Sequence, residues 1–219
     1  MKFPRVKVCG LARPQDAIAA VAAGADAVGV VHYPPSPRSI EAEQAVAIFD
    51  AAQQAATSAN QNQPLHVAVM VDVTPEEARQ WMHTANATAI QLCGAEHAGD
   101  WRDFPAPILR RIGVDETGSE QMRDWQNIAS GFVLDHPASA GGSGKTVDVE
   151  IARELSRLAP CLLAGGLGAD NVAAAIRQVQ PWGVDASSRL EQRPGAKDHD
   201  LTEQFVINAR AALSSLSPR

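Results

Sequence analysis

The sequence has no run of about 18 hydrophobic residues, the length that a membrane-spanning helix needs. Its opening residues, Met1 to Arg5, lack the long apolar segment of a signal peptide. It also has no cluster of Lys and Arg, and its net charge is −6. We therefore expect no membrane segment and no nucleic-acid partner, although local basic charge can still bind a small anion.

Cysteine is scarce as well. The chain has three, Cys9, Cys93 and Cys161, and they form no CxxC pair. This pattern does not resemble a disulfide framework, so we expect a protein of the reducing cytoplasm. Hydrophobic residues make up 45% of the 219 residues, and this length allows one α/β barrel or two small domains.

Short hydrophobic runs alternate with Ala-rich amphipathic segments along the whole chain. Each run is continuously hydrophobic, as is typical of parallel strands covered on both faces. The predicted strands are Arg5–Cys9, Ala27–Val31, His66–Val71, Ala89–Leu92, Ile108–Ile112, Gly131–Leu134, Cys161–Ala164 and Trp182–Asp185. The predicted helices are Pro14–Gly24, Glu41–Ala56, one opening at Thr74, Ala98–Asp103, Ser119–Asn127, Asp148–Leu158, Asp170–Val179 and Asp200–Leu216.

Eight strand-then-helix units predict a small (β/α)8 TIM barrel, a single domain covering residues 1–219. A doubly wound open sheet is the rival architecture. No domain boundary is evident, and we interpret the polar stretch Thr57–Pro64 as a surface loop. In such a barrel the active site lies at the carboxyl ends of the strands, so the residues found there are the candidates for function.

Cys9 ends the first predicted strand and is the first candidate. A buried structural cysteine is the alternative. Lys7 lies two residues earlier, so both side chains point to the same face of the strand. A nearby ammonium lowers the pKa of a thiol and would make Cys9 a base. Lys7 would then need a carboxylate partner, for which we expect Asp185 on the neighbouring strand.

Asp135 closes the sixth strand after a hydrophobic run. Desolvation there would raise its pKa, which suits a general acid, although an Asp that caps a turn is the alternative. The loop after it, His136–Thr146, is rich in Gly and Ser and could act as a lid. Its Gly144-Lys145-Thr146 resembles the end of a phosphate-binding P-loop, but Ser139 stands where the first glycine is required, so we reject that motif.

Binding residues are predicted after three other strands. Gly165-Gly166 and Ser187-Ser188 follow strands seven and eight, where phosphate is usually bound in barrels. Arg38 lies in a loop with three prolines that would hold its guanidinium in place for a carboxylate. A simple turn and a solvated arginine are the alternatives. The histidines have no metal-ligand spacing, and a site made of His32, Cys9 and Cys93 is the weak exception, so we expect no metal.

Six segments in order resemble the phosphoribosylanthranilate isomerase family of tryptophan biosynthesis. They are Lys7–Leu11, Tyr33–Arg38, Gln91–Gly94, Gly141–Thr146, Ala164–Leu167 and Pro194–Asp198. The resemblance implies a (β/α)8 barrel and an Amadori rearrangement of N-(5-phosphoribosyl)anthranilate to 1-(2-carboxyphenylamino)-1-deoxyribulose 5-phosphate, without a cofactor. It leaves a monomer or a homodimer open.

The resemblance also implies roles for particular residues. Asp135 would be the general acid that protonates the furanose ring oxygen, and Cys9 the general base that takes the C2 proton. Arg38 would hold the anthranilate carboxylate. The remaining substrate-binding residues would be Gly142, Gly165, Gly166, Ser187 and Ser188, with Lys7, Gln91 and Asp185 in support.

Three positions depart from the family pattern. Cys93 stands where histidine is usual, Arg189 where a small residue is usual, and His32 where an apolar or aromatic residue is common. Arg189 could contact phosphate or reshape its loop. Two other functions remain open: a related isomerase of histidine biosynthesis, which we would expect to carry Asp in place of Cys9, and a non-catalytic phosphate-binding barrel, against which the presence of both Cys9 and Asp135 speaks.

Overall fold

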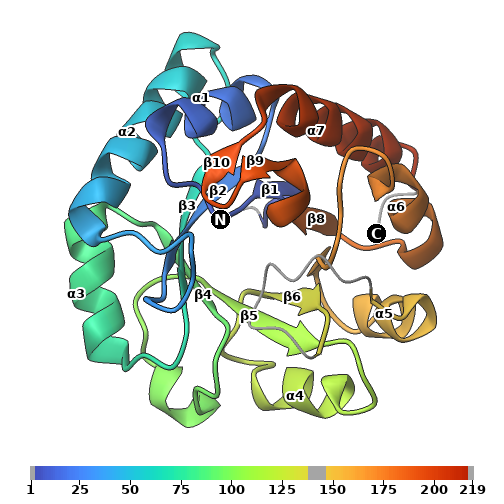
Figure 1. The fold of residues 1–219 in the computed structure, drawn as a ribbon. Coiled ribbons are helices and arrows are strands. Elements are labelled where there is room, and N and C mark those ends of the chain that lie inside the picture. Colours follow the sequence, from blue (N-terminus) through green and yellow to red (C-terminus); the bar gives the residue numbers. More distant parts are fainter. Residues whose placement is uncertain (1–2, 138–146, 217–219) are drawn as a thin grey trace.

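The computed structural model describes residues 3–137 and 147–216, and its centre is a closed barrel of parallel strands (Figure 1). The strands are β1 Val6–Val8, β2 Ala27–His32, β3 Leu65–Met70, β4 Ala89–Leu92, β5 Ile108–Gly113, β6 Gly131–Asp135, β7 Cys161–Leu163 and β8 Gly183–Ala186. Each pairs with the next, and β8 closes the barrel on β1. The predicted (β/α)8 barrel is therefore confirmed, and the open sheet is excluded.

Helices surround the barrel and cover the outer face of the strands (Figure 1). They are α1 Pro14–Ala22, α2 Ala42–Ser58, α3 Pro75–Ala85, α4 Gly118–Asp124, α5 Val149–Ser156, α6 Val172–Val179 and α7 His199–Ser214. Thr74 and Glu77 form the capping box that opens α3, with Pro75 in its first turn. In the described residues, no helix is long and apolar enough to cross a membrane.

The helix predicted over Ala98–Asp103 is shorter in the structure and of a different type. The segment forms only a short 3-10 helix, η1, over Ala98–Trp101. Gly99 disfavours a regular helix there, and Pro105 follows too closely for further turns to form. Trp101 is nevertheless buried against the barrel, so this turn covers the strands where a helix was expected.

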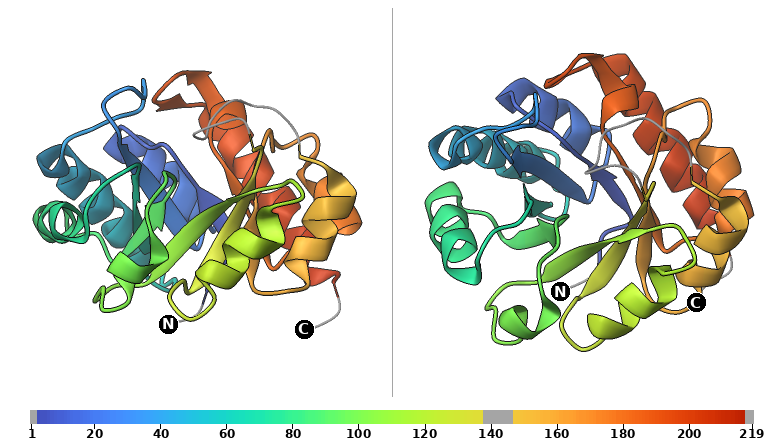
Figure 2. Two further views of the ribbon diagram at one scale, coloured as in Figure 1. Left: turned by 90° about the horizontal axis from the view of Figure 1, so that it is seen from below. Right: turned by 60° about the horizontal axis from the view of Figure 1, so that its bottom comes forward.

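A β-hairpin that was not predicted follows β8. After the short 3-10 helix η2, Ser188–Leu190, the strands β9, Glu191–Arg193, and β10, Ala196–Lys197, pair antiparallel. The hairpin rises at the same end of the barrel as the connection between β2 and α2 (Figure 2). The fully buried carboxylate of Asp16 in α1 holds it in place by accepting the backbone N–H of Lys197 at 3.1 Å.

Candidate active site

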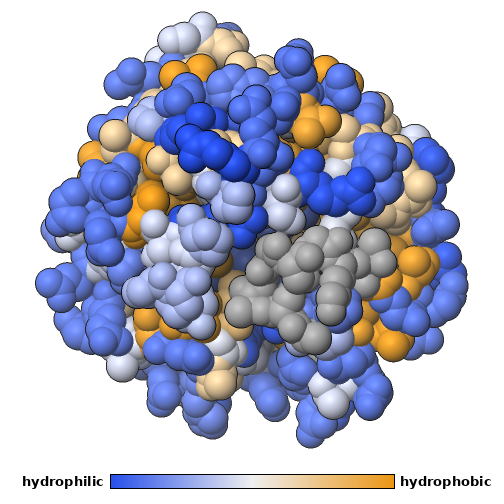
Figure 3. All heavy atoms as spheres, viewed as in Figure 1, coloured by the Kyte–Doolittle hydropathy of each residue, from blue (hydrophilic) through white to orange (hydrophobic). Residues whose placement is uncertain are grey.

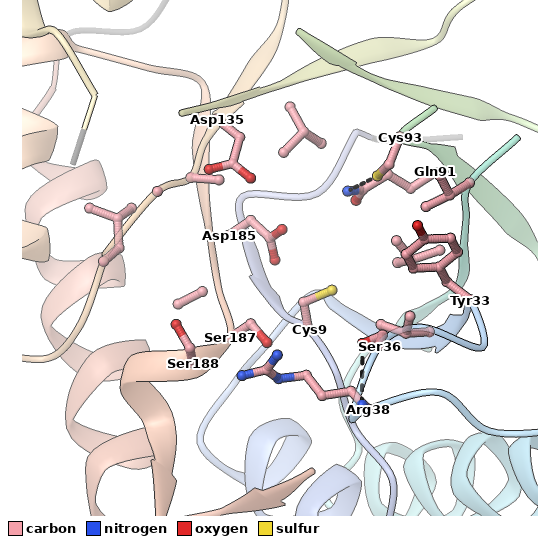
Figure 4. A pocket seen from close by; sticks show the side chains of 18 of the residues that line it. Cys9, Tyr33, Ser36, Arg38, Gln91, Cys93, Asp135, Asp185, Ser187 and Ser188 are labelled. Carbon is pink, nitrogen blue, oxygen red and sulfur yellow. Dashed lines mark hydrogen bonds between the residues drawn. The ribbon is translucent and has the colours of Figure 1, made fainter. Parts of the chain in front are cut away.

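A pocket opens at the carboxyl ends of the strands and collects most of the predicted residues (Figure 4). Its polar lining consists of Cys9, Tyr33, Ser36, Arg38, Gln91, Cys93, Asp135, Asp185, Ser187 and Ser188, together with the backbone of Gly165 and Gly166. Apolar side chains such as Val31, Val69 and Val133 complete it. Hydrophilic side chains predominate on this end of the molecule, with hydrophobic patches between them (Figure 3).

Cys9 and Lys7 share the interior face of the barrel. Lys7 is fully buried, and Cys9 is 7% exposed. Gly29 on β2 makes room for both, since a Cβ added there would lie 3.0 Å from the Cys9 sulfur and 3.2 Å from Cε of Lys7. Lys7 Nζ donates to Asp185 Oδ2 at 2.9 Å, which confirms the partner predicted for it.

The ion pair changes the chemistry expected of Cys9. Burial raises the pKa of the Cys9 thiol, and Lys7 lowers it too little to compensate, while Asp185 adds to the rise. The sequence led us to expect a lowered pKa, and that expectation is wrong for the protein without ligand. The main physical reason is the burial of the thiol, and Asp185 offsets part of the effect of the Lys7 charge.

Asp135 ends β6 with its carboxyl group in the pocket (Figure 4). Burial raises the pKa of Asp135, although the backbone N–H of His136, which donates to Oδ1 at 2.8 Å, and the charge of Arg111 work in the opposite direction. The direction is the one expected for a desolvated carboxyl at the end of an apolar strand. At a given pH a larger fraction of this group carries a proton than of an ordinary Asp.

The two predicted phosphate-binding segments lie side by side in the pocket. Gly165 and Gly166 both have positive φ, 84° and 64°, so glycine is required for the turn that brings their backbone to the pocket. Ser187 and Ser188 line the same wall (Figure 4). Arg189 reaches out of this wall to Asp170 in the loop after β7, at 2.8 Å, and so links the two segments.

Arg38 is held by residues to which the sequence analysis gave no role. Its Nε and Nη2 donate to the two carboxylate oxygens of Glu191, each at 2.8 Å. Lys197 Nζ also donates to Glu191, at 2.8 Å. The signal was present, because Glu191 closely follows the Ser187-Ser188 pair and Lys197 lies in a segment that carries the family resemblance. From the sequence we expected the prolines of the loop, and not a carboxylate, to hold the guanidinium of Arg38 in place.

The other predicted residues divide into those inside the pocket and those elsewhere. Gln91 Nε2 donates to the sulfur of Cys93 at 3.3 Å, and burial raises the pKa of that thiol to about 12.

His32 instead points outward and contacts the Trp81 ring, with centroids 5.3 Å apart, so it does not join Cys9 and Cys93. Gly142 and most of the suggested lid lie outside the described residues. Within 3–137 and 147–216, no group of three His, Cys, Asp or Glu side chains could hold a metal ion.

The family model of N-(5'-phosphoribosyl)anthranilate (PRA) isomerase matches residues 6–208 of the chain. A relative from Trichlorobacter lovleyi, named N-(5'-phosphoribosyl)anthranilate isomerase, is 38% identical over 95% of this chain and 99% of its own length. One from Halobacterium salinarum, of the same name, is 36% identical over 94% of this chain and 96% of its own.

Solved structures give the same result for the whole barrel. The phosphoribosyl anthranilate isomerase from Thermotoga maritima has a TM-score of 0.81 and 31% identity, and the match covers 95% of this chain and 100% of that one. Another phosphoribosyl anthranilate isomerase, solved in complex with reduced 1-(o-carboxyphenylamino)-1-deoxyribulose 5-phosphate, has a TM-score of 0.76 at 31% identity with the same coverage. Their barrels therefore extend over the same segments as the one described above.

Proposed function

The chain belongs to the phosphoribosylanthranilate isomerase family and is an aldose–ketose isomerase of tryptophan biosynthesis, for which we propose that Asp135 is the general acid and Cys9 the general base. One observation carries this assignment. A carboxyl group with a raised pKa and a thiol above a buried ion pair line a single pocket, although they lie far apart in the sequence. Groups that differ in environment in this way suit opposite proton transfers.

The proposed reaction starts at the furanose ring. Asp135 gives its proton to the ring oxygen, the bond from that oxygen to C1 breaks, and the nitrogen lone pair forms a protonated Schiff base with C1. Cys9 then removes the proton from C2, and the electrons of that C–H bond form a C1=C2 double bond. The electrons of the C1=N double bond return to nitrogen, which gives an enol. The enol becomes the ketone of the product when C1 gains a proton and the C2 hydroxyl loses its proton.

The raised pKa of Cys9 is compatible with this role. A thiol with a high pKa is a stronger base once it is ionised, but less of it is ionised in the free protein. The protonated Schiff base brings a positive charge next to Cys9 at the moment when the thiolate is needed. That charge lowers the pKa of the thiol, as any nearby cation does.

Different residues of the pocket lining would hold the two ends of the substrate. Backbone N–H groups at Gly165 and Gly166, with the hydroxyls of Ser187 and Ser188, offer donors to the phosphate. Arg38 offers its guanidinium to the anthranilate carboxylate. Lys7, Asp185 and Gln91 would support the site from below, and Gly142 would contribute from the loop after β6.

We also propose that the enzyme works in the cytoplasm on this small phosphorylated substrate, without nucleic acid or membrane. The net charge of −6 supports this setting, as does the small number of cysteines, which form no CxxC pair. The enzyme would act as a monomer or a homodimer. The Thermotoga maritima relative is named as a dimeric enzyme from which monomers were generated.

Growth of a tryptophan auxotroph that lacks this isomerisation tests the proposed function. We expect the wild-type chain to restore growth without tryptophan and the double variant Cys9→Ser/Asp135→Asn to fail at equal protein level. Cys161→Ser is the matched control and should restore growth, because Cys161 is buried at the start of β7, away from the pocket. Growth with the double variant would contradict the assignment of both residues, and failure of the wild-type chain would contradict the activity.

A further inference from the structure

Glu191 holds Arg38 by one edge of its guanidinium group. The two hydrogen bonds use Nε and Nη2, each at 2.8 Å, and they form the side-on pair typical of arginine and carboxylate. Both side chains are largely buried, with 12% of Arg38 and 4% of Glu191 exposed. Such a pair fixes the plane of the guanidinium, which the backbone of a loop alone cannot do.

The opposite edge of Arg38 is left for the pocket. Nη1 makes no hydrogen bond to any residue in the described ranges, and Nη2 keeps one N–H beyond the one that it gives to Glu191. Arg38 lines the pocket, and its guanidinium lies beside Ser187 (Figure 4). These free N–H groups match a second carboxylate in the end-on arrangement.

Lys197 adds a positive charge beside the pair of Arg38 and Glu191. The ion pair of a guanidinium and one carboxylate has no net charge, so it attracts a second carboxylate only weakly. Lys197 is fully buried, and its Nζ has three acceptors: Glu191 Oε1 at 2.8 Å, Ser187 O at 3.1 Å and Ser187 Oγ at 3.4 Å. Three acceptors match the three protons of an ammonium group. Burial lowers the pKa of Lys197, and the charge of Glu191 works in the opposite direction. With Lys197 protonated, the trio of Arg38, Glu191 and Lys197 carries one net positive charge.

We propose that Glu191 is a positioning residue that aims the free edge of Arg38 at the carboxylate of the anthranilate substrate. Lys197 keeps the trio positive and ties Glu191 to the Ser187 backbone, so the carboxylate end and the phosphate end of the pocket share one support. This inference rests on the proposed role of Arg38. It extends that role to a residue of the β9 strand, outside the loop that carries Arg38.

Two ligands separate this role from a merely structural one. The first is the reduced product, 1-(2-carboxyphenylamino)-1-deoxyribulose 5-phosphate with its ketone reduced, and the second is the same molecule with phenyl in place of carboxyphenyl. The ratio of their inhibition constants measures how strongly the protein prefers the carboxylate. We expect Glu191→Gln to reduce this preference by about tenfold or more, the scale of hydrogen bonds to charged groups, with the affinity for the phenyl ligand nearly unchanged.

The sign of the effect is the decisive feature. If Glu191 only neutralised Arg38, its replacement by Gln would leave more positive charge and strengthen the carboxylate preference, which would overturn the proposal. Equal losses for both ligands would do so as well, because they would indicate general damage to the pocket. Glu203→Gln, on the exposed face of α7, is the matched control and should leave the ratio unchanged.

Arg38→Ala and the double variant Arg38→Ala/Glu191→Gln complete a double-mutant cycle. We expect Arg38→Ala to remove the preference and Glu191→Gln to add little in that background, because Glu191 acts through Arg38. If Arg38→Ala keeps the preference, the proposed role of Arg38 fails; if only Glu191→Gln keeps it, the inference alone fails. Should Glu191→Gln not fold, Glu191→Asp retains the charge but withdraws the carboxylate, and an undiminished preference in that variant would overturn the proposal.

Discussion

The Cys9 thiol lies above a buried ion pair, and its own burial is the main influence on its acidity. Lys7 and Asp185 neutralise each other at 2.9 Å, so burial dominates and the pKa of the thiol is raised. The two partners of the ion pair could be predicted from the sequence, because Lys7 shares a strand face with Cys9 and Asp185 lies on the strand that closes the barrel. The balance between burial and charge could not, since it depends on the distance between the two ions.

Alkylation of Cys9 by iodoacetamide as a function of pH tests this balance. Only the thiolate reacts, so the rate rises with pH and levels off above the pKa. In the ligand-free protein we expect the rate to keep rising beyond about pH 8.5, the ordinary pKa of cysteine. Asp185→Asn should shift the curve to lower pH, because Lys7 then has Cys9 as its next anionic partner.

Peptide mass spectrometry assigns the label to Cys9 and not to Cys93 or Cys161, and the melting curve of Asp185→Asn shows whether the variant is folded. A plateau at or below the ordinary value in the wild-type protein would refute the raised pKa. An unshifted curve in a folded Asp185→Asn variant would refute the part assigned to the ion pair.

Single elements show where sequence patterns reach their limit. The hydrophobic runs predicted all eight strands, and Thr74 with Glu77 predicted the start of α3, because these signals are local. The β9–β10 hairpin was not predicted, because its residues Glu191 and Lys197 are charged and give no hydrophobic pattern. In the fold they are nevertheless buried, against partners that include residues far away in the sequence. Such burial depends on Arg38 and Asp16, which only the folded barrel brings near.

Asp16 connects α1 with the hairpin and α7, and its removal should destabilise the protein. It is fully buried and accepts hydrogen bonds from Arg13, His199 and the backbone of Lys197. We expect Asp16→Ala to lower the free energy of unfolding by about 2–3 kcal/mol, because it leaves a buried N–H group without a partner. Urea denaturation near pH 7 measures the difference, with Glu203→Ala as an exposed control.

The pH dependence of this loss has a definite sign. Burial raises the pKa of Asp16, but the hydrogen bonds from Arg13 and His199 outweigh it and the net shift is downward. The stabilisation is therefore present above about pH 4, where the unfolded carboxyl is ionised, and disappears as the pH falls through the lower folded pKa. The gap between wild type and Asp16→Ala should narrow in acid, and a gap that widens in acid would contradict the ion-pair account.

At the scale of the whole molecule, the closed barrel is what brings the chemistry together. Cys9 directly follows β1, Asp135 ends β6, and the phosphate segments follow β7 and β8, so only closure places all of them around one pocket. The order of the strands could be predicted from their alternation with helices, and so could this convergence. The support of Arg38 by Glu191 could not, because it depends on side-chain contacts between loops.

The central claim is that Cys9 and Asp135 transfer protons and do little to bind the substrate. The most direct measurement is the kcat of Cys9→Ser and Asp135→Asn in the isomerisation of N-(5-phosphoribosyl)anthranilate, with the affinity of each variant for the reduced product determined alongside. We predict that kcat falls by at least about 100-fold in each, the scale of general acid–base catalysis, while the affinity stays within about threefold of wild type. A variant that keeps near-wild-type kcat, or that loses affinity in proportion to its rate, would contradict the role given to that residue.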